Sequence, residues 1–446
     1  MSDRGEIAAM SIAPMTPHDV IIHTHLPFLQ HTSYISRLSI VSIYALVAST
    51  TLYVFNNNNN KHAPPGHRHR LFIAAACIVV NFLLPTIFHP VDEVVTTALI
   101  GLNFMWLASA KIFGWAIGRG PLSLSQLNFL QFTTTVFLPI TPVITGASGS
   151  RQQQPHSVAG NGVLASTGKT CTTGRSSNAR QAETGLGFVG SVLDFASKLV
   201  LLALVVGVLQ SERIEIPSRL LRELLYALGL YLFIALVMSC VGVFTISLLN
   251  LRVAPHFDKP FLSQSFTDFW SRRWNLNTGY TMRFLVYDPI CEGTLTPAAF
   301  GGVTGGVPTN NKIKNGSNTP SSTTTVKSKV TLTFERRVAA VCASFIVSGL
   351  LHEVFIIYLR GRVSGYWLAF FSLQGPIIVL ESLARRIARL YKIRVPNFVA
   401  VPLTIGALLL LGDAFFFYDI NRMGIPAQVV GNIHATLVRG SLSLKN

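Results

Sequence analysis

The sequence predicts an all-α protein that crosses a membrane several times, and three observations lead to this fold class. Half of the 446 residues are hydrophobic and only 12% are charged, against roughly 25% charged residues in a typical soluble domain. Apolar runs of about 20 residues, the length that spans a hydrocarbon core, recur along the chain. A helix satisfies its own backbone hydrogen bonds in lipid, so helical spans suit this composition.

The apolar runs predict a bundle of seven to nine membrane-spanning helices. The runs are Leu38–Phe55, Leu71–Phe88, Val94–Ile117, Phe188–Gln210, one within Glu223–Asn250, Val338–Leu359, Tyr366–Glu381 with its flanks, and Phe398–Phe417. The stretch Pro121–Val143 is only moderately apolar and carries Pro139 and Pro142 near its end. We expect it to lie at the membrane surface or to re-enter the membrane without crossing it.

The runs and the segments between them divide the chain into eight parts. These are a mobile N-terminal tail (1–34), N-terminal membrane helices (35–144), a low-complexity loop (145–187), further membrane helices (188–250), a polar motif region (251–292), a low-complexity insert (293–330), C-terminal membrane helices (331–420) and a tail (421–446). Five consecutive asparagines, Asn56–Asn60, are expected to form a solvated loop. The insert also holds a sequon at Asn315, which matters only if that loop is lumenal.

The charge of the chain is +17, from 36 Lys and Arg residues against 19 Asp and Glu residues. The basic residues are dispersed in short clusters between apolar runs, which argues against a nucleic-acid-binding protein. Such clusters typically meet anionic head groups, and they also attract a polyanionic cosubstrate. The residues that best mark a cytoplasmic loop are Arg385, Arg386, Arg389, Lys392 and Arg394.

The five cysteines show no paired spacing, so the sequence supports neither a disulfide framework nor a zinc site. Isolated charges inside the spans should find partners. We expect Asp194 to pair with Lys198 four residues later, and Lys111 to extend its ammonium group out of the membrane. Glu381 and Asp413 are each expected to pair with an arginine or lysine of another loop.

One polar stretch, Gln264–Asn277, stands out from the apolar chain. If it forms one helix, the 3.6-residue period places Gln264, Asp268, Ser271, Arg272 and Asn275 on one side, and Phe266, Phe269, Trp270, Arg273 and Asn277 on the other. Composition alone favours an amphipathic helix in the head-group layer. The mixture of amide, carboxylate and guanidinium groups instead favours a hydrogen-bonded site, in which the arginines suit phosphate and the tryptophans suit an acyl chain.

A second polar position, His352, lies well inside the Val338–Leu359 run. An ionisable residue at this depth is either a functional group or a neutral histidine bonded to a neighbouring helix, and position alone weighs the two equally. Ser348 shares its helix face, whereas Glu353 points about 100° away. For Glu353 we favour a packing partner for an arginine over a member of the site.

These residues resemble the signature of the plant wax synthase-like branch of the membrane-bound O-acyltransferases (MBOAT). The similar segments are SQSFTDFWSRRWN (Ser263–Asn275) with the upstream PHFDKPF, the later FLVYDP, SGLLHE (Ser348–Glu353), and WLASAKI (Trp106–Ile112) with Gly120-Pro121-Leu122. The resemblance covers most of the chain from about Leu38 to Tyr418, apart from the two low-complexity segments, which are longer than the family leads us to expect.

The resemblance implies an MBOAT-like helix bundle in the endoplasmic reticulum membrane, with the Arg-Arg-Trp-Asn motif on an interfacial helix. It implies transfer of a fatty acyl group from acyl-CoA, as cosubstrate, to a long-chain alcohol or a sterol, without a resident cofactor or a metal. The family's catalytic pair falls on His352 and Asn275. The remaining site residues are assigned to substrate binding: Arg272, Arg273, Trp270, Trp274, Asp268, Ser348 and Glu353.

In this chemistry His352 removes the proton of the alcohol as general base, and Asn275 donates to the developing oxyanion or orients the nucleophile. We expect one arginine of the pair to be structural and the other to face the substrate. The alternative hypothesis is a transporter with His352 and Glu353 in a proton or ion path. It predicts matching halves of broken helices, and the sequence shows no convincing pair of these.

Overall fold

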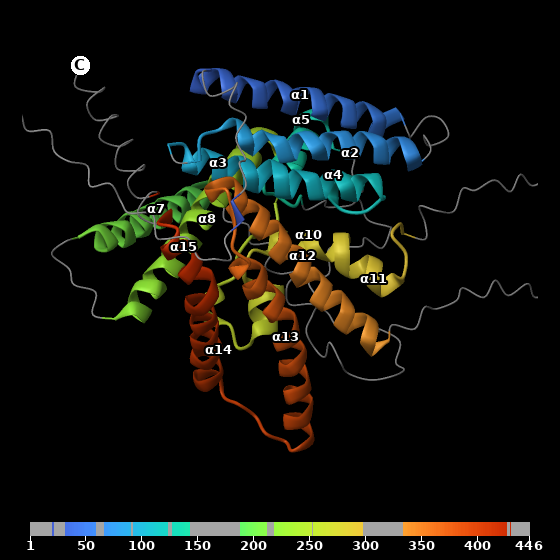
Figure 1. The fold of residues 1–446 in the computed structure, drawn as a ribbon. Helices are drawn as coiled ribbons and strands as arrows, with labels where there is room; N and C mark the ends of the chain where they lie inside the picture. Colours follow the sequence, from blue (N-terminus) through green and yellow to red (C-terminus); the bar gives the residue numbers. More distant parts are fainter. Residues whose placement is uncertain are drawn as a thin grey trace, which may run out of the picture.

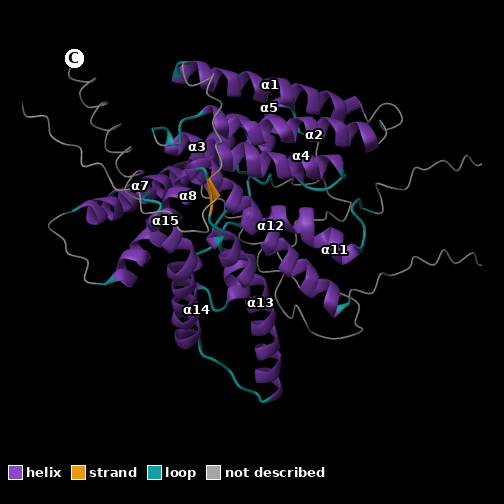
Figure 2. Ribbon diagram, viewed as in Figure 1, coloured by secondary structure: helices purple, strands orange, loops and turns teal. Residues whose placement is uncertain are grey.

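A computed structural model describes residues 20–21, 32–58, 67–90, 92–123, 127–142, 188–211, 218–251, 253–297, 333–425 and 429. It confirms the predicted all-α multi-pass membrane fold, because eight helical segments of the described chain are long and apolar enough to cross a membrane. The strands in this part of the chain are two short ones, β1 (Val20–Ile21) and β2 (Arg362–Val363), which pair antiparallel with Val20 opposite Val363. Figure 2 shows this strand pair among the helices.

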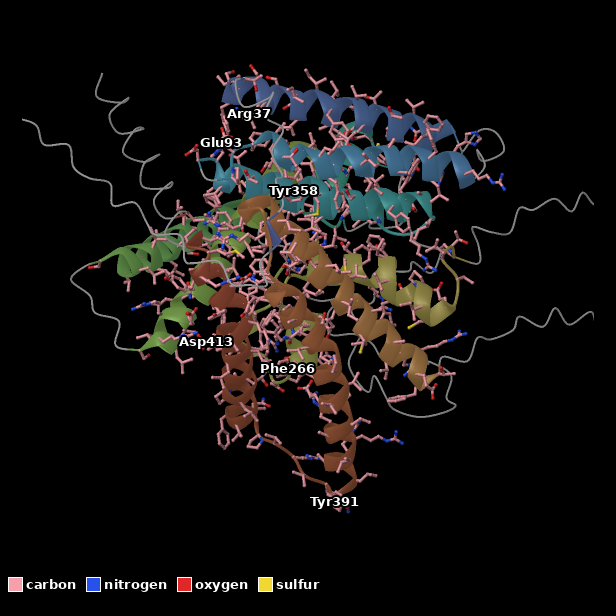
Figure 3. The ribbon with its side chains drawn as sticks, viewed as in Figure 1. Arg37, Glu93, Phe266, Tyr358, Tyr391 and Asp413 are labelled. Carbon is pink, nitrogen blue, oxygen red and sulfur yellow. The ribbon has the colours of Figure 1, made fainter. Side chains whose placement is uncertain are left out.

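The N-terminal helices stack side by side in one part of the molecule (Figure 1). They are α1 (Tyr34–Asn58), α2 (His67–Leu83), η2 (Leu84–Ile87), α3 (Val94–Ile100), the π-helical η3 (Gly101–Ala108), α4 (Ser109–Ala116), η4 (Pro121–Ser123) and α5 (Phe129–Phe137). Their shared core includes Leu52, Phe88, Ile112 and Trp115, each at most 1% exposed. At one end of the stack Arg37 forms an ion pair with Glu93 (Figure 3).

Two expectations for these helices are wrong. Lys111 is 1% exposed and does not reach solvent. Its Nζ donates to the carbonyl oxygens of Thr135 (2.8 Å) and Leu138 (2.6 Å). These carbonyls belong to the end of α5, where a cation satisfies acceptors that the helix leaves free. Asn56 also departs from the predicted loop, because α1 continues through Asn58 and Asn56 Oδ1 accepts from Trp115 Nε1 at 3.1 Å.

Two long helices precede the motif region, which is built from short pieces. The elements are α7 (Phe188–Gln210), α8 (Arg219–Leu249), η5 (Pro260–Leu262), α9 (Phe266–Asp268), the π-helical turn η6 (Phe269–Arg273), α10 (Leu276–Met282), the π-helical η7 (Arg283–Tyr287) and α11 (Asp288–Glu292). Within α7, Lys198 pairs with Asp194 as predicted, and Ser239 of α8 joins the pair.

The C-terminal helices carry His352 and enclose the motif. They are α12 (Phe334–Arg360), α13 (Tyr366–Leu390), α14 (Asn397–Leu411), the π-helical η8 (Gly412–Phe417) and α15 (Tyr418–Arg422). A Cβ atom at Gly375 of α13 would lie 3.0 Å from the Cα of Cys342 in α12, so glycine permits a close approach of these two helices. The far ends of α13 and α14 project away from the bundle, with Tyr391 near the tip (Figures 1 and 3).

Several sequence predictions fall outside the described residues. These are most of the N-terminal tail, the low-complexity loop 145–187, the sequon at Asn315, and most of the insert 293–330. The division of the chain into eight parts stays a prediction.

Candidate active site

His352 lies near the middle of the long helix α12 and is held in one orientation. Its Nδ1 is 2.7 Å from the carbonyl oxygen of Ser348. A carbonyl oxygen only accepts, so Nδ1 carries the proton and Nε2 of the neutral ring keeps its lone pair. The free lone pair makes Nε2 the atom of this histidine that can act as a base.

Three aromatic side chains from two helical segments, α13 and η3, surround the His352 ring. Phe371 of α13 stacks on it, with ring centroids 3.8 Å apart and planes 21° apart. Trp106 of η3 packs edge-on at 4.4 Å, and Trp367 lies at 5.5 Å. The Trp106 indole Nε1 is buried and makes no hydrogen bond within the described part of the chain. This enclosure restricts water and fixes the plane of the imidazole.

The motif Gln264–Asn277 does not form the single helix that its periodicity predicts. Ser265 caps α9, because its Oγ accepts from the backbone N–H of Asp268 at 2.9 Å. The helical path ends where Trp274 becomes extended. Asn275 follows in the left-handed region, with φ 40°, and begins the new helix α10. The predicted stripe therefore breaks before Asn275, and the two ends of the motif lie on different helices.

The oxygen and the nitrogen of the Asn275 side-chain amide differ in their hydrogen bonding. Its Oδ1 accepts from the backbone N–H of Thr278 at 3.3 Å, which caps α10. Its Nδ2 makes no hydrogen bond among the described residues, and the residue is only half-buried. Asparagine tolerates a left-handed backbone better than most residues, so the turn and the cap both favour it. The amide nitrogen remains available as a donor.

The two arginines of the motif differ in their surroundings. Arg273 donates through Nε to Asp268 at 2.7 Å and through a terminal nitrogen to the Asp258 carbonyl oxygen at 3.2 Å. Arg272 lies 4.0 Å from Asp268, and its side chain is 38% exposed against 19% for Arg273. Arg273 therefore holds the fold of the motif, and Arg272 is the freer cation.

The two tryptophans of the motif are also held by neighbours. Trp274 stacks on Phe269, with centroids 5.3 Å and planes 16° apart. Trp270 donates from Nε1 to Gln374 of α13 at 3.0 Å and packs against Phe371 at 5.9 Å. Because Phe371 also stacks on His352, one aromatic ring connects the motif to the histidine.

Glu353 contacts a helix N-terminus and not the arginine that we expected. Its Oε1 accepts from the backbone N–H groups of Ser364 (2.6 Å) and Gly365 (2.7 Å). Its Oε2 accepts from Leu368 at 3.3 Å. A carboxylate suits the free N–H groups at the start of α13. Glu353 therefore joins α12 to α13 one residue after His352.

The acids of the C-terminal spans have two kinds of partner. Asp413 forms the expected ion pair across helices, with Arg219 at 2.8 Å. For Glu381 the expected partner from another loop is wrong, because its carboxylate pairs with Arg385 of its own helix at 3.1 Å. Its carboxylate accepts from the backbone N–H groups of Phe266 and Thr267, both at 3.0 Å. Figure 3 shows Phe266 close to α13.

A further histidine with buried ring nitrogens, His256, lies just before the motif. Its carbonyl oxygen accepts from the backbone N–H of Leu276 at 2.8 Å, next to Asn275. Burial, reinforced by the positive charges of Lys111 and Lys198, lowers the pKa of His256 to about 4. The ring is therefore neutral at pH 7. The hydrophobic periodicity that located His352 gives no signal at His256, because this residue lies in an irregular segment.

The structure brings His352 and the motif to the same part of the molecule, but no hydrogen bond joins His352 to Asn275 within the described residues. Among the hydrogen bonds and ring contacts of the described residues, the link runs from His352 through Phe371 to Trp270. Two residues of α13 contact Trp270: Phe371, which is part of this link, and Gln374. Neither carries a local sequence signal, because Trp270 is remote in sequence, 104 positions from Gln374.

Comparison with known proteins agrees with the motifs. No family model matches the chain. A long-chain-alcohol O-fatty-acyltransferase of Simmondsia chinensis is 25% identical over 370 residues, which cover 82% of this chain and 86% of that protein. The chain is thus similar over most of its length to a plant long-chain-alcohol O-fatty-acyltransferase. This confirms the resemblance to the wax synthase-like branch that the motif residues indicate.

Two more relatives are similar over comparable lengths. The acyl-CoA–sterol O-acyltransferase 1 of Arabidopsis thaliana is 23% identical over 398 residues, or 88% of this chain and 93% of that protein. The probable long-chain-alcohol O-fatty-acyltransferase 2 of the same plant is 25% identical over 375 residues, or 83% of this chain and 84% of that protein. The similarity thus includes proteins named for two kinds of acceptor.

Proposed function

We propose that this protein is an O-acyltransferase that esterifies a long-chain fatty alcohol or a sterol with the acyl group of acyl-CoA, inside the endoplasmic reticulum membrane. The observation that carries the proposal is the oriented His352, whose Nε2 bears a free lone pair, connected through Phe371 to the acyltransferase-like motif. The names of the relatives support this reaction class. Both lipid substrates partition into a membrane, which fits the eight apolar helices.

In the proposed mechanism His352 Nε2 takes the hydroxyl proton of the acceptor as its oxygen attacks the thioester carbonyl carbon. The C–O bond forms and the C–S bond breaks, so that the CoA thiolate leaves. His352 then returns the proton to the thiolate, which gives the ester and free CoA. An alcohol is a poor nucleophile at neutral pH, and a positioned general base contributes about 100- to 10,000-fold to the rate.

In this mechanism Asn275 donates a hydrogen bond to the carbonyl oxygen of the thioester. Its Nδ2 is the amide atom that the α10 cap leaves unused, and an N–H group stabilises the negative charge that develops on this oxygen. Arg272, the more exposed of the two arginines, is suited to bind the CoA phosphates. Asp268 and Arg273 hold the loop that presents both residues.

The transporter hypothesis receives no support from the neighbours of Glu353. Its carboxylate is occupied by the backbone N–H groups at the start of α13, which leaves it poorly suited to carry protons along a path beside His352. The relatives described above are all named as acyltransferases.

Expression in a host that lacks neutral-lipid synthesis tests the proposal. Fatty alcohols and sterols are supplied in separate cultures, and the esters are identified by mass spectrometry. We expect a wax ester or a steryl ester with the wild-type chain and neither with His352→Ala at equal membrane abundance. Solute flux into proteoliposomes without any ester would instead support the transporter.

A further inference from the structure

One face of α13 contacts both His352 and the motif. Phe371 stacks on the His352 ring at 3.8 Å. One turn later Gln374 accepts from Trp270, and two turns after that Glu381 accepts from the first backbone N–H groups of α9. Residues spaced by three and seven positions share one side of a helix. This α13 face is therefore a common support for two parts of the site that lie far apart in sequence.

The orientation of the Gln374 amide is fixed by its two partners. The Trp270 indole N–H only donates, so it must meet Oε1, at 3.0 Å. The Phe370 carbonyl oxygen only accepts, so it must meet Nε2, at 3.1 Å. Gln374 is fully buried. A buried amide with both ends bonded holds its partner in one place, because any displacement leaves a polar group unsatisfied.

The position of α13 relative to α12 is itself restricted. Gly375, next to Gln374, lies so close to the α12 backbone that an added Cβ would be 3.0 Å from the Cα of Cys342. A Cβ atom added at Gly349 of α12 would likewise lie 3.1 Å from the carbonyl oxygen of Leu368 in α13. Glu353 bonds the start of α13. The α13 face is thus rigidly attached to α12, the helix that carries His352.

We propose that Gln374 is a positioning residue for acyl transfer, which sets the placement of the motif relative to His352 through its hydrogen bond to Trp270. Gln374 touches neither substrate in this account. It acts on the reaction geometry because Trp270 lies in the motif five residues before Asn275, and Phe371 lies in the same turn of α13 against the His352 ring. The inference rests on the proposed acyltransferase function.

The test is a double-mutant cycle on the purified protein in lipid nanodiscs. Gln374→Met keeps the volume of the side chain and removes the acceptor, and Trp270→Phe removes the same bond from the other side. We measure kcat and KM for acyl-CoA and for the acceptor in both single variants and in the double variant. A displacement of reacting groups by about 1 Å can cost 100-fold in rate, so we expect each single variant to lower kcat about 10- to 100-fold.

Two results separate positioning from general destabilisation. The double variant should be no slower than the slower single variant, because both changes remove one bond. Gln374→Glu, in its protonated form, can accept from Trp270 and donate to Phe370, so it should recover activity as the pH falls. The matched control is Gln131→Met, which loses a hydrogen bond from α5 to the Leu249 carbonyl oxygen at the end of α8. It should lower the melting temperature without lowering kcat.

Additive losses in the cycle, or an unchanged kcat in Gln374→Met, would overturn the positioning role while the wild-type protein still makes ester. If Gln374→Met does not fold, Trp270→Phe and Gln374→Glu still decide the question, since a normal kcat in Trp270→Phe overturns it. A wild-type protein that forms no ester would overturn the proposed function itself, together with this inference.

Discussion

His352 and Asn275, the two residues proposed for catalysis, are held by the structure in opposite ways. His352 is on a regular 27-residue helix, α12, with one ring nitrogen bonded to the helix backbone and the ring enclosed by aromatic residues. Asn275 is on a break between two short helical pieces, in a left-handed conformation. The base is therefore fixed by its own helix, whereas the amide is fixed by the residues that hold the turn.

Because of this difference, we expect substitutions at His352 and at Asn275 to affect activity and folding differently. Changes at His352 should affect chemistry with little effect on folding, because the α12 backbone does not need the imidazole. Changes around Asn275 should combine an effect on chemistry with an effect on the turn, because its Oδ1 caps α10. Four tests of this contrast are ordered by the size of the expected effect.

His352→Ala should show the largest effect. Loss of the general base is expected to lower kcat about 100- to 10,000-fold. The protein should still accumulate in membranes and melt within a few degrees of the wild type. The measurement is ester formation per mole of purified protein, with the melting temperature as control. Ester synthesis at the wild-type rate would remove His352 from the mechanism.

Asn275→Asp tests the two ends of the amide separately. An aspartate keeps an oxygen to cap α10 but has no N–H to donate, so the fold should persist while kcat falls about 100- to 1000-fold. Asn275→Gly is the matched variant, because glycine accepts the left-handed backbone but loses both ends of the side chain. Full activity in Asn275→Asp would reduce Asn275 to a helix cap.

The two arginines of the motif offer a smaller, paired contrast. Arg272→Gln should raise KM for acyl-CoA about tenfold, the value of one charge-assisted hydrogen bond, and leave the melting temperature unchanged. Arg273→Gln should instead lower the stability, because it leaves Asp268 without its closest cation. Steady-state kinetics and thermal melting of the two variants make the comparison. An exchange of the two phenotypes would show that the assignments are reversed.

The smallest effect is expected from the neutral histidine before the motif. Because the pKa of His256 falls from 6.5 to about 4 in the folded state, the unfolded state binds a proton first as the pH decreases. Stability is therefore lost as the pH falls through the window from 6.5 to about 4, by at most about 3 kcal/mol. His256→Gln should flatten the pH dependence of the melting temperature in this window. An unchanged slope would contradict the buried, neutral state.

Much of the fold was predictable because lipid imposes a simple rule on sequence. A span needs a long apolar run, and the eight runs of the sequence correspond to the eight apolar helices of the structure. The same rule made His352 a candidate site residue, since a histidine inside such a run is exceptional. The short pieces around the motif obey no such rule, and periodicity placed Asn275 on a helix that ends at Arg273, two residues earlier.

The errors share one physical cause, which is tertiary contact. Lys111 stays inside because the carbonyl oxygens at the end of α5 accept hydrogen bonds from its ammonium group. Glu353 meets the start of α13 because that helix has free N–H groups. Gln374 has no local pattern at all, because its partner Trp270 lies in a different helical segment. Such partners come from remote parts of the chain and leave no mark on hydrophobic periodicity.

Ester formation by the purified protein tests the central claim most directly. The wild-type chain in nanodiscs is mixed with acyl-CoA and either a fatty alcohol or a sterol, and both the ester and the released CoA are quantified. We expect one CoA for each ester with at least one acceptor, and neither product above background with His352→Ala. Folded wild-type protein that forms no ester with either acceptor would contradict it.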